Sequence, residues 1–223
     1  SAGYAGYDAG HAERKVMNEA SQHFKLLADR IEQYFEHGGC DRLLIGCRDD
    51  VWSEIEPHLQ SLARQHLVGH FRIDPKVAAP EQVKQMAHEQ LAAYSANLKQ
   101  GLVREAIGEA HRNGRGAIGL RRVLRSLETG EVSTLLLGAN FYAPGVKCYH
   151  CGHMDLHAAP ICAVCGKDNT ELEDIGDAIV GHAIRTGVQI VSISDDEEFD
   201  RIGRIAALLR FRADQNATVK AAG

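Results

Sequence analysis

Four of the six cysteines lie in one short segment and form two closely spaced pairs. Cys148 and Cys151 make the first C-x2-C pair, Cys162 and Cys165 make the second, and the spacing between the pairs is C-x10-C. Two such pairs on separate turns supply four thiolates in the tetrahedral arrangement that zinc prefers. Because thiolate fills every position and none is left for water, we predict a structural Zn²⁺ site rather than a catalytic one.

The residues around these cysteines agree with a zinc knuckle. Gly152 and Gly166 each follow the second cysteine of a pair, where the backbone must fold back toward the metal. Nothing in the sequence marks the chain as secreted, so we expect a reducing compartment, in which metal ligation is favoured over a disulfide. The alternative is a degenerate site with free or disulfide-linked thiols. Substitute ligands are also available nearby, although solvated loop histidines are the favoured interpretation of His150, His153 and His157.

Other candidate nucleophiles and bases have simpler interpretations. The sequence contains no G-x-S-x-G nucleophile elbow and no G-x4-G-K-[ST] phosphate loop. Cys40 and Cys47 flank or end a predicted strand, so we interpret them as small buried hydrophobic residues. His11, Glu13 and His23 lie on the first predicted helix, where a solvated helix start is favoured over contacts with RNA phosphates or acid–base chemistry.

Two charged segments are candidates for binding. The acidic run at 195–200 is interpreted as a solvated loop and helix cap, with a divalent metal site or a basic partner as alternatives. A group of arginines in the second half is a candidate for contacts with rRNA phosphates, and a solvated helix face is the alternative. These candidate RNA-binding residues are Arg112, Arg115, Arg121, Arg122 and Arg125.

The elements that must position these residues are helices and strands in alternation. In the first half, the periodicity of apolar residues predicts helices over 11–36 and 80–111, the second of them broken near 95–97. Short apolar runs at 41–47 and 67–73 predict strands, and a helix opens at Asp49 between them. Residues 1–10 contain three glycines without a helical period and predict a mobile loop.

The second half continues the same alternation. Helices are predicted at 120–128 and 174–186, and strands at 132–137, 188–194 and 205–212. Residues 197–204 are ambiguous. Strands that alternate with helices indicate an α/β fold. We therefore predict two α/β domains over 1–97 and 98–213, with a zinc-ribbon-like insertion of four cysteines at 148–165 and a disordered tail at 214–223.

Composition narrows the classes of function. The 223 residues are 44% hydrophobic and carry a formal charge of −5, which excludes a generally basic nucleic-acid coat protein but not a local RNA-binding patch. No apolar run approaches the length of a membrane span, and no signal peptide is visible, so we expect a cytoplasmic protein without membrane contact. We expect no DNA partner either.

Segments of the second half resemble a known family. The stretch 116–137, GAIGLRRVLRSLETGEVSTLLL, is similar to the part of archaeal and eukaryotic class I release factors that reads as a helix followed by "AL..G.V.TLL". The stretch 171–211 resembles their closing segment and ends in the run IAALLRF. The order, spacing and ending of these segments agree with the C-terminal domain of release factors.

The first half resembles the middle domain of the same family more loosely. A glycine-rich loop, a long helix and the runs LLIGC and LVGHFRI follow one another in the expected order. The Gly-Gly-Gln motif, with which release factors assist peptidyl-tRNA hydrolysis, is absent from the sequence. The family also includes Pelota, a rescue factor without Gly-Gly-Gln, and a bacterial branch with the ribosome hibernation factor Balon. This chain looks closest to the bacterial branch.

The resemblance implies a non-catalytic factor that binds the ribosomal A site and blocks or rescues ribosomes. It implies rRNA and a translational GTPase as partners, elongation factor Tu in the bacterial branch, and an N-terminal domain upstream of Ser1. The alternatives are a release factor with a substituted loop, in which Asp8 or His11 orients water, and an RNA-binding or interaction module outside the ribosome. The residues expected to reach the peptidyl-transferase centre are Gly3, Tyr4, Gly6, Tyr7, Asp8, Gly10 and His11.

Overall fold

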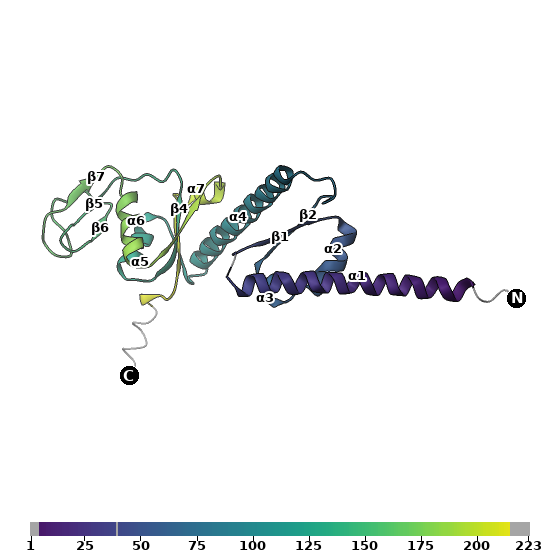
Figure 1. Ribbon diagram of the computed structural model, residues 1–223. Coiled ribbons are helices and arrows are strands. Elements are labelled where there is room, and N and C mark those ends of the chain that lie inside the picture. Colours follow the sequence, from purple (N-terminus) through teal and green to yellow (C-terminus); the bar gives the residue numbers. More distant parts are fainter. Residues whose placement is uncertain (1–4, 39, 215–223) are drawn as a thin grey trace, which may run out of the picture. The chain divides into compact units, whose positions relative to one another are not determined.

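A computed structural model describes residues 5–38 and 40–214 of the chain (Figure 1). The chain divides into two compact units, Ser1–Ser95 and Ala96–Gly223, close to the predicted boundary at residue 97. Both units combine helices with strands, so the predicted α/β class is confirmed. The predicted tail lies almost entirely outside the described residues.

The first unit begins with one long helix, α1 (Ala5–Glu36), which extends beyond the rest of the unit in Figure 1. The predicted loop over residues 1–10 is therefore wrong from Ala5 onward, while Gly3 and Tyr4 lie outside the described residues. The physical reason is that alanines and charged residues with high helix propensity surround Gly6 and Gly10 and outweigh the cost of these two glycines. Gly38, in the left-handed region with φ 71°, follows the end of the helix, as its position in the sequence predicts.

A two-stranded parallel sheet packs against α1. Strands β1 (Leu43–Cys47) and β2 (Leu67–Arg72) pair in parallel, and the chain crosses between them through α2 (Asp49–Ile55), the 3₁₀ helix η1 (Glu56–His58) and α3 (Ser61–His66). Both predicted strands are thereby confirmed. The core of this unit is small, and its buried members are Ala28, Ile55, Leu59 and Ala63.

A buried carboxylate on α1 caps the next helix. Glu32 is only 8% exposed, and its two carboxylate oxygens accept hydrogen bonds from the backbone N–H groups of Leu62 and Ala63, at 3.0 and 2.9 Å. These N–H groups belong to the first turn of α3, whose own N-cap residue makes no side-chain bond. Glu32 therefore satisfies donors that α3 leaves unpaired and ties α1 to the crossover.

Replacing Glu32 with alanine should destabilise the first unit. We expect a loss of about 1–2 kcal/mol, because two buried donors lose their acceptor. Urea unfolding monitored by circular dichroism measures the change. The exposed Glu36 on the same helix is the matched control, and Glu36→Ala should change stability by less than about 0.5 kcal/mol. Equal losses for the two variants would show that the cap contributes nothing.

Helix α4 (Pro80–His111) runs across the boundary between the two units. It opens on Pro80, as predicted, but the predicted break near 95–97 is wrong, because the helix is continuous. Ser95 and Asn97 are only mildly unfavourable in a helix, and good helix formers flank them. Along α4, burial is confined to the end that belongs to the second unit, at Val103, Ala106 and Ile107.

The second unit contains a four-stranded mixed sheet in the order β3-β9-β4-β8. Strand β9 is antiparallel to both of its neighbours, whereas β4 and β8 are parallel. The predicted helices and the three predicted strands are present, and the short strand β3 was not predicted. The strands are β3 (Gly116–Ile118), β4 (Val132–Gly138), β8 (Gln189–Ile193) and β9 (Ile205–Leu209), and the helices are α5 (Leu120–Glu128), α6 (Gly176–Arg185) and α7 (Glu197–Arg201).

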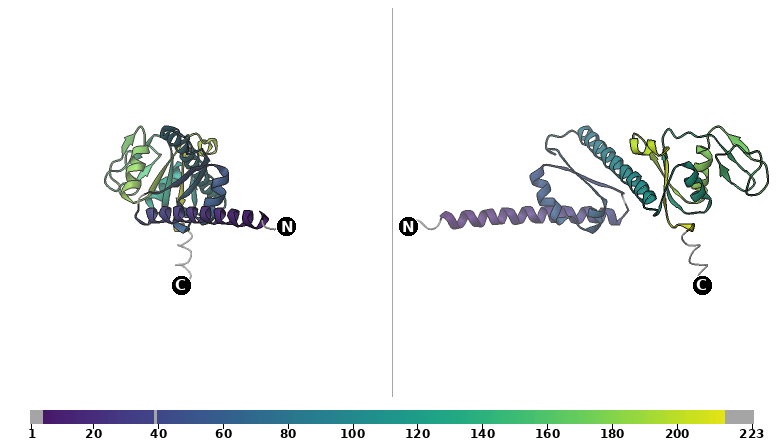
Figure 2. Two further views of the ribbon diagram at one scale, coloured as in Figure 1. Left: turned by 45° about the vertical axis from the view of Figure 1, so that its right-hand side comes forward. Right: turned by 180° about the vertical axis from the view of Figure 1, so that it is seen from behind.

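Helices cover both faces of this sheet (Figures 1 and 2). On one face, Leu135 and Ala207 pack in a core with α5 and α6. On the other face, the adjacent residues Leu136 and Ala206 pack with the end of α4 and with Phe199 of α7. Successive residues of a strand point to opposite faces, so the unbroken apolar runs of β4 and β9 reflect burial on both sides.

The cysteine segment forms a small sheet of its own, in the order β6-β5-β7. Its strands are β5 (Gly145–Lys147), β6 (Met154–Asp155) and β7 (Thr170–Leu172). Strands this short carry no periodic signal, which is why the sequence did not predict them. Among the helices that the structure describes, none combines the length and apolar character needed to cross a membrane.

Candidate zinc centre and arginine surfaces

The structure brings the four paired cysteines together. The four Sγ atoms of Cys148, Cys151, Cys162 and Cys165 all lie within 4.8 Å of one another. The Sγ atoms of Cys148 and Cys165 are 3.5 Å apart, and those of Cys151 and Cys162 are 3.6 Å apart. Thiolates at about 2.3 Å from a tetrahedral zinc ion are separated by about 3.8 Å, so this geometry fits a zinc ion. All four cysteines are free thiols, not disulfides.

The two cysteine pairs share one backbone pattern. The N–H of Gly152 donates to the carbonyl of Cys148 at 2.8 Å, and the N–H of Gly166 donates to that of Cys162 at 2.9 Å. Both glycines have positive φ, 83° and 70°, a conformation that residues with a Cβ rarely adopt. The repeated turn aims both cysteines of each pair at one point, as the positions of the glycines predict.

The backbone also favours thiolate at one ligand. The N–H of Cys151 points at the Cys148 sulfur and, together with that of His150 and against the effect of burial, lowers the pKa of Cys148 to about 6. A thiol with this pKa is mostly ionised near neutral pH, and metal binding requires the ionised form. The donor set is therefore suited to a soft cation such as zinc.

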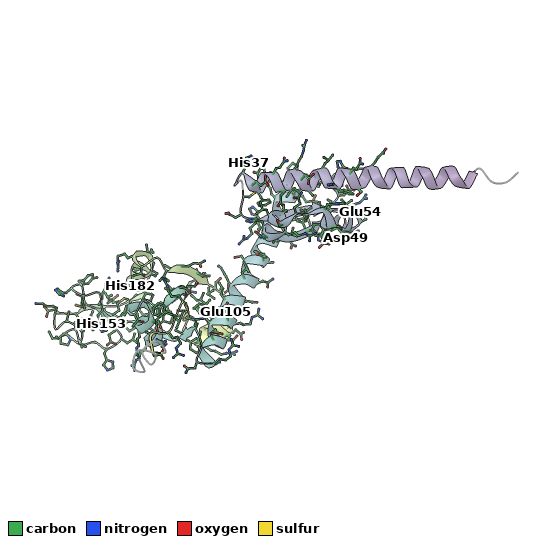
Figure 3. All side chains as sticks on the ribbon, turned by 90° about the horizontal axis from the view of Figure 1, so that it is seen from below. His37, Asp49, Glu54, Glu105, His153 and His182 are labelled. Atoms are coloured by element: carbon green, nitrogen blue, oxygen red, sulfur yellow. The ribbon has the colours of Figure 1, made fainter. Side chains whose placement is uncertain are left out.

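The module is anchored to the rest of its unit by Glu128 at the end of α5. One Glu128 carboxylate oxygen accepts from the backbone N–H of Met154 at 3.0 Å and lies 2.6 Å from Nδ1 of His153 (labelled in Figure 3). Met154 itself is buried in the core beneath α5 and α6. His153 thus lies outside the four-sulfur cluster, but its side chain is only 17% exposed, so its interpretation as a solvated loop histidine is wrong.

The two cysteines outside the cluster differ in their exposure to solvent. Cys47 is buried at the end of β1, and burial, reinforced by Asp49 and Asp50, raises the pKa of its thiol. Cys40 is exposed, so its interpretation as a buried hydrophobic residue is wrong. The physical reason is that β1 begins only at Leu43, which leaves Cys40 in the turn before the strand.

The acidic run serves as a helix cap, as interpreted from the sequence. Asp196 is the N-cap residue of α7, and its side chain accepts a hydrogen bond from the backbone N–H of Phe199 at 2.9 Å. Asp200 pairs with Arg204 at 2.8 Å. Within residues 5–38 and 40–214, the four cysteines form the sole cluster of His, Cys, Asp or Glu side chains whose ligand atoms approach closely enough to hold a metal.

The five candidate RNA-binding arginines occupy different local settings. Arg112 and Arg115 lie in the exposed turn between α4 and β3, where Arg112 pairs with Glu109. The other three lie on α5 and line one groove together. Arg122 pairs with the buried Glu131 at 3.1 Å, whereas Arg121 and Arg125 are exposed.

Glu131 is a buried structural carboxylate that sequence reasoning missed. Its side chain is 2% exposed. One of its oxygens accepts from Arg122 and the other from the backbone N–H of Ala213, at 2.6 Å. Burial alone would raise the pKa of Glu131, but the Ala213 amide and Arg122 outweigh burial and hold that pKa below its usual range. Through its hydrogen bond with the Ala213 N–H, Glu131 thus holds the segment after β9 in place.

One G-x-G-x-x-G run, Gly114–Gly119, precedes α5. In dinucleotide-binding folds such a run follows a strand and opens a helix. Here it follows α4, and the short strand β3 lies inside it. The structural context therefore gives no support to a dinucleotide site. Gly116 has a packing reason instead, because an added Cβ would meet the backbone of Ala106 at 2.2 Å.

The site and fold together define a class: a chain of two α/β units, the second of which carries a four-cysteine metal module. Comparison with known proteins shows which proteins this chain is similar to. Residues 2–92 match the model of the family "Bacterial archaeo-eukaryotic release factor family 10". The chain is also 32% identical over 120 residues to peptide chain release factor subunit 1 of Pyrococcus abyssi, an alignment that covers 44% of this chain and 29% of that protein. Both comparisons show similarity to archaeo-eukaryotic release factors, the family that the sequence motifs resemble.

The fold is similar to that of one solved structure. A model of ribosome-bound archaeal Pelota and ABCE1 aligns with a TM-score of 0.52 and 17% identity over 86% of this chain and 49% of that one. The C-terminal domain of a peptide chain release factor from Methanosarcina mazei aligns at 24% identity with a TM-score of 0.43, over 62% of this chain and 99% of that one. The present chain spans 29% of the curated release factor and about half of the Pelota chain.

Proposed function

We propose that this chain is part of a cytoplasmic translation factor that binds the ribosomal A site and blocks or rescues ribosomes, in hibernation or stalling. The observation that carries the proposal is the family match of residues 2–92 to bacterial relatives of release factors. The archaeal Pelota that shares this fold is described as ribosome-bound, which supports the ribosome as the partner.

The proposed factor is not a hydrolase. Release factors use a Gly-Gly-Gln motif to assist peptidyl-tRNA hydrolysis, and this sequence has none. Steric occupation of the A site needs no catalytic group, so a sequence without that motif is compatible with this role. A release factor with a substituted loop, in which Asp8 or His11 orients water, is the competing hypothesis.

The exposed turn between α4 and β3 is the part we assign to RNA. It has the sequence HRNGR, and Arg112 and Arg115 are both exposed in it. Exposed arginines in such a turn can contact RNA phosphates. Each phosphate contact adds a salt-dependent contribution to the affinity for RNA. The zinc module has no open ligand position and acts as a rigid structural element. The further partner we propose is a translational GTPase, elongation factor Tu in bacteria.

Sedimentation with purified ribosomes tests the proposal. The full chain should pellet with ribosomes, and the double variant Arg112→Glu/Arg115→Glu should bind at least about tenfold more weakly, because two phosphate contacts become repulsive. Arg185→Glu, which reverses an exposed charge on α6, is the matched control and should bind normally. A chain that stays in the supernatant at low salt would refute the ribosomal role.

A peptide-release assay on programmed ribosomes separates the two ribosomal hypotheses. The blocking factor should release no peptide and should compete with a true release factor. Peptide release that disappears in the variant Asp8→Ala/His11→Ala would instead establish the hydrolase.

A further inference from the structure

The second unit has an open groove beside the start of α5, and neither the zinc centre nor the proposed RNA turn uses it. The groove measures about 480 Å³. It lies where strand β3 turns into helix α5 (labelled in Figure 1), and the turn is made by Gly119, with φ 77°. The residues that line it are Ile118, Gly119, Leu120, Arg121, Arg122 and Arg125.

The floor of the groove is aliphatic and rigid. Leu120 is partly buried and packs against the core under α5 and α6, while Ile118 packs against the core on the opposite face of the sheet. Each side chain is thus held by the interior on one side and accessible on the other. Such a floor offers apolar area without the entropic cost of ordering a loop on binding.

The rim of the groove is cationic and largely free. Arg122 is neutralised by Glu131, but Arg121 and Arg125 are exposed on successive turns of α5. In the part of the chain that the structure describes, neither of these two side chains takes part in an ion pair. Two uncompensated guanidinium groups that flank an aliphatic floor favour a ligand with carboxylates at its edges and an aliphatic centre.

The composition of the groove lining favours a protein ligand over RNA. Single-stranded nucleic acid binds chiefly by stacking bases on aromatic side chains, and none of the six lining residues is aromatic. The apolar floor does not stabilise a bound phosphate backbone. A leucine or isoleucine side chain that covers the floor makes binding more favourable, because apolar area is removed from water.

We propose that the groove at the start of α5 binds an acidic, aliphatic segment of a partner protein. Its Asp or Glu side chains pair with Arg121 and Arg125, and one aliphatic side chain covers Ile118 and Leu120. The inference goes beyond the proposed function, because it concerns a protein ligand and does not require a ribosome.

Fluorescence anisotropy with the full chain tests this site directly. The probe is a labelled peptide made only of Asp, Glu and Leu, compared with a peptide in which Ser replaces every Leu and with labelled oligouridine. The first peptide should bind, and its affinity should fall with added salt. Removing the leucines should weaken binding at least about tenfold, because the aliphatic floor then stays uncovered.

The double variant Arg121→Glu/Arg125→Glu should weaken peptide binding by at least about tenfold, since both rim charges become repulsive. Both side chains are exposed, so the fold should persist, and unchanged circular dichroism would verify that. Arg185→Glu carries a comparable charge reversal outside the groove, at an exposed residue of α6, and should bind the peptide normally. Failure of the wild-type chain to bind, equal binding by the double variant, or preferential loss of oligouridine binding would each overturn the proposal. Ribosome sedimentation is also measured for the same double variant, so that failure of the peptide test can be distinguished from failure of the proposed function.

Discussion

Replacing Cys148 with alanine should remove the metal from the chain and unfold the cysteine module. Metal analysis of the wild-type chain should find one zinc per chain, and the variant should contain almost none. Hydrogen exchange of residues 145–172 should rise from slow to fast, while exchange in β4 and β9 should stay slow. The expected effect is large, because structural zinc in small sites contributes about 10 kcal/mol or more to folding.

The reason lies in how little else holds this module together. Its three strands have two or three residues each, and its two cysteine turns meet at the sulfur cluster. Apart from the four sulfurs, the module is held by the contacts of Glu128 with His153 and Met154 and by the burial of Met154 in the core under α5 and α6.

The exposed Cys40 provides the matched control. Cys40→Ala removes a thiol from the same chain but not from the four-sulfur cluster, so it should leave the zinc content and exchange rates unchanged. A chelator should reproduce the Cys148→Ala exchange pattern in the wild-type chain. Zinc retained in full by Cys148→Ala, or exchange that does not change, would contradict the structural role of the metal.

The cluster of four cysteines was predictable from the sequence because its geometry is local. Two C-x2-C pairs with a glycine after each one carry both the ligands and the turns that aim them. The long helices and most strands were predictable for a similar reason, since the apolar spacing within a segment reflects its own burial. The prediction of α5 over 120–128 agrees with the structure residue by residue, since Gly119 and Gly130 bracket it.

Three features that sequence reasoning missed depend on contacts between distant residues. Glu32 caps α3 from a position thirty residues earlier, and Glu131 binds an amide that lies 82 residues later. Both are charged residues at positions that a sequence pattern assigns to the surface. The groove beside α5 likewise depends on β3, which exists only because β9 pairs with it. The start of α1 was misplaced for a local reason, because three glycines in residues 1–10 suggested a loop.

The match of residues 2–92 to a bacterial family shows where sequence and structure complement each other. The motifs quoted for the second half were the more specific ones, yet the family model matches the first unit. The motif resemblance in the second half and the family match in the first half are both similarities to release factors. The cysteine module and the α5 groove are features of this chain that the family match over residues 2–92 does not cover.

Replacing Glu131 with glutamine should destabilise the second unit by about 3 kcal/mol. Removing one partner of a buried ion pair costs about 3–5 kcal/mol, and the lower end applies because the Arg122 side chain is 32% exposed. Glutamine has the same shape but only one acceptor oxygen. Its amide N–H group must therefore face either Arg122 or the Ala213 N–H, both of which are donors.

The effect should depend on pH in a defined direction. The folded state holds the pKa of Glu131 below its usual range, so the unfolded chain binds a proton at this residue more readily. The stability that the carboxylate contributes is therefore present above the unfolded pKa of about 4.3 and is lost as the pH falls through the lower folded value. The difference between wild type and Glu131→Gln should be largest near neutral pH and should shrink below about pH 4.

Urea unfolding at several pH values, followed by circular dichroism, measures both expectations. Glu197→Gln is the matched control, because that side chain is 91% exposed and pairs only with Arg201 on the surface. It should change stability by less than about 0.5 kcal/mol at any pH. If Glu131→Gln is as stable as wild type at neutral pH, the contacts of the Glu131 carboxylate with Arg122 and the Ala213 N–H do not stabilise the unit. A gap between the two that widens with acid would refute the direction assigned to the pKa of Glu131.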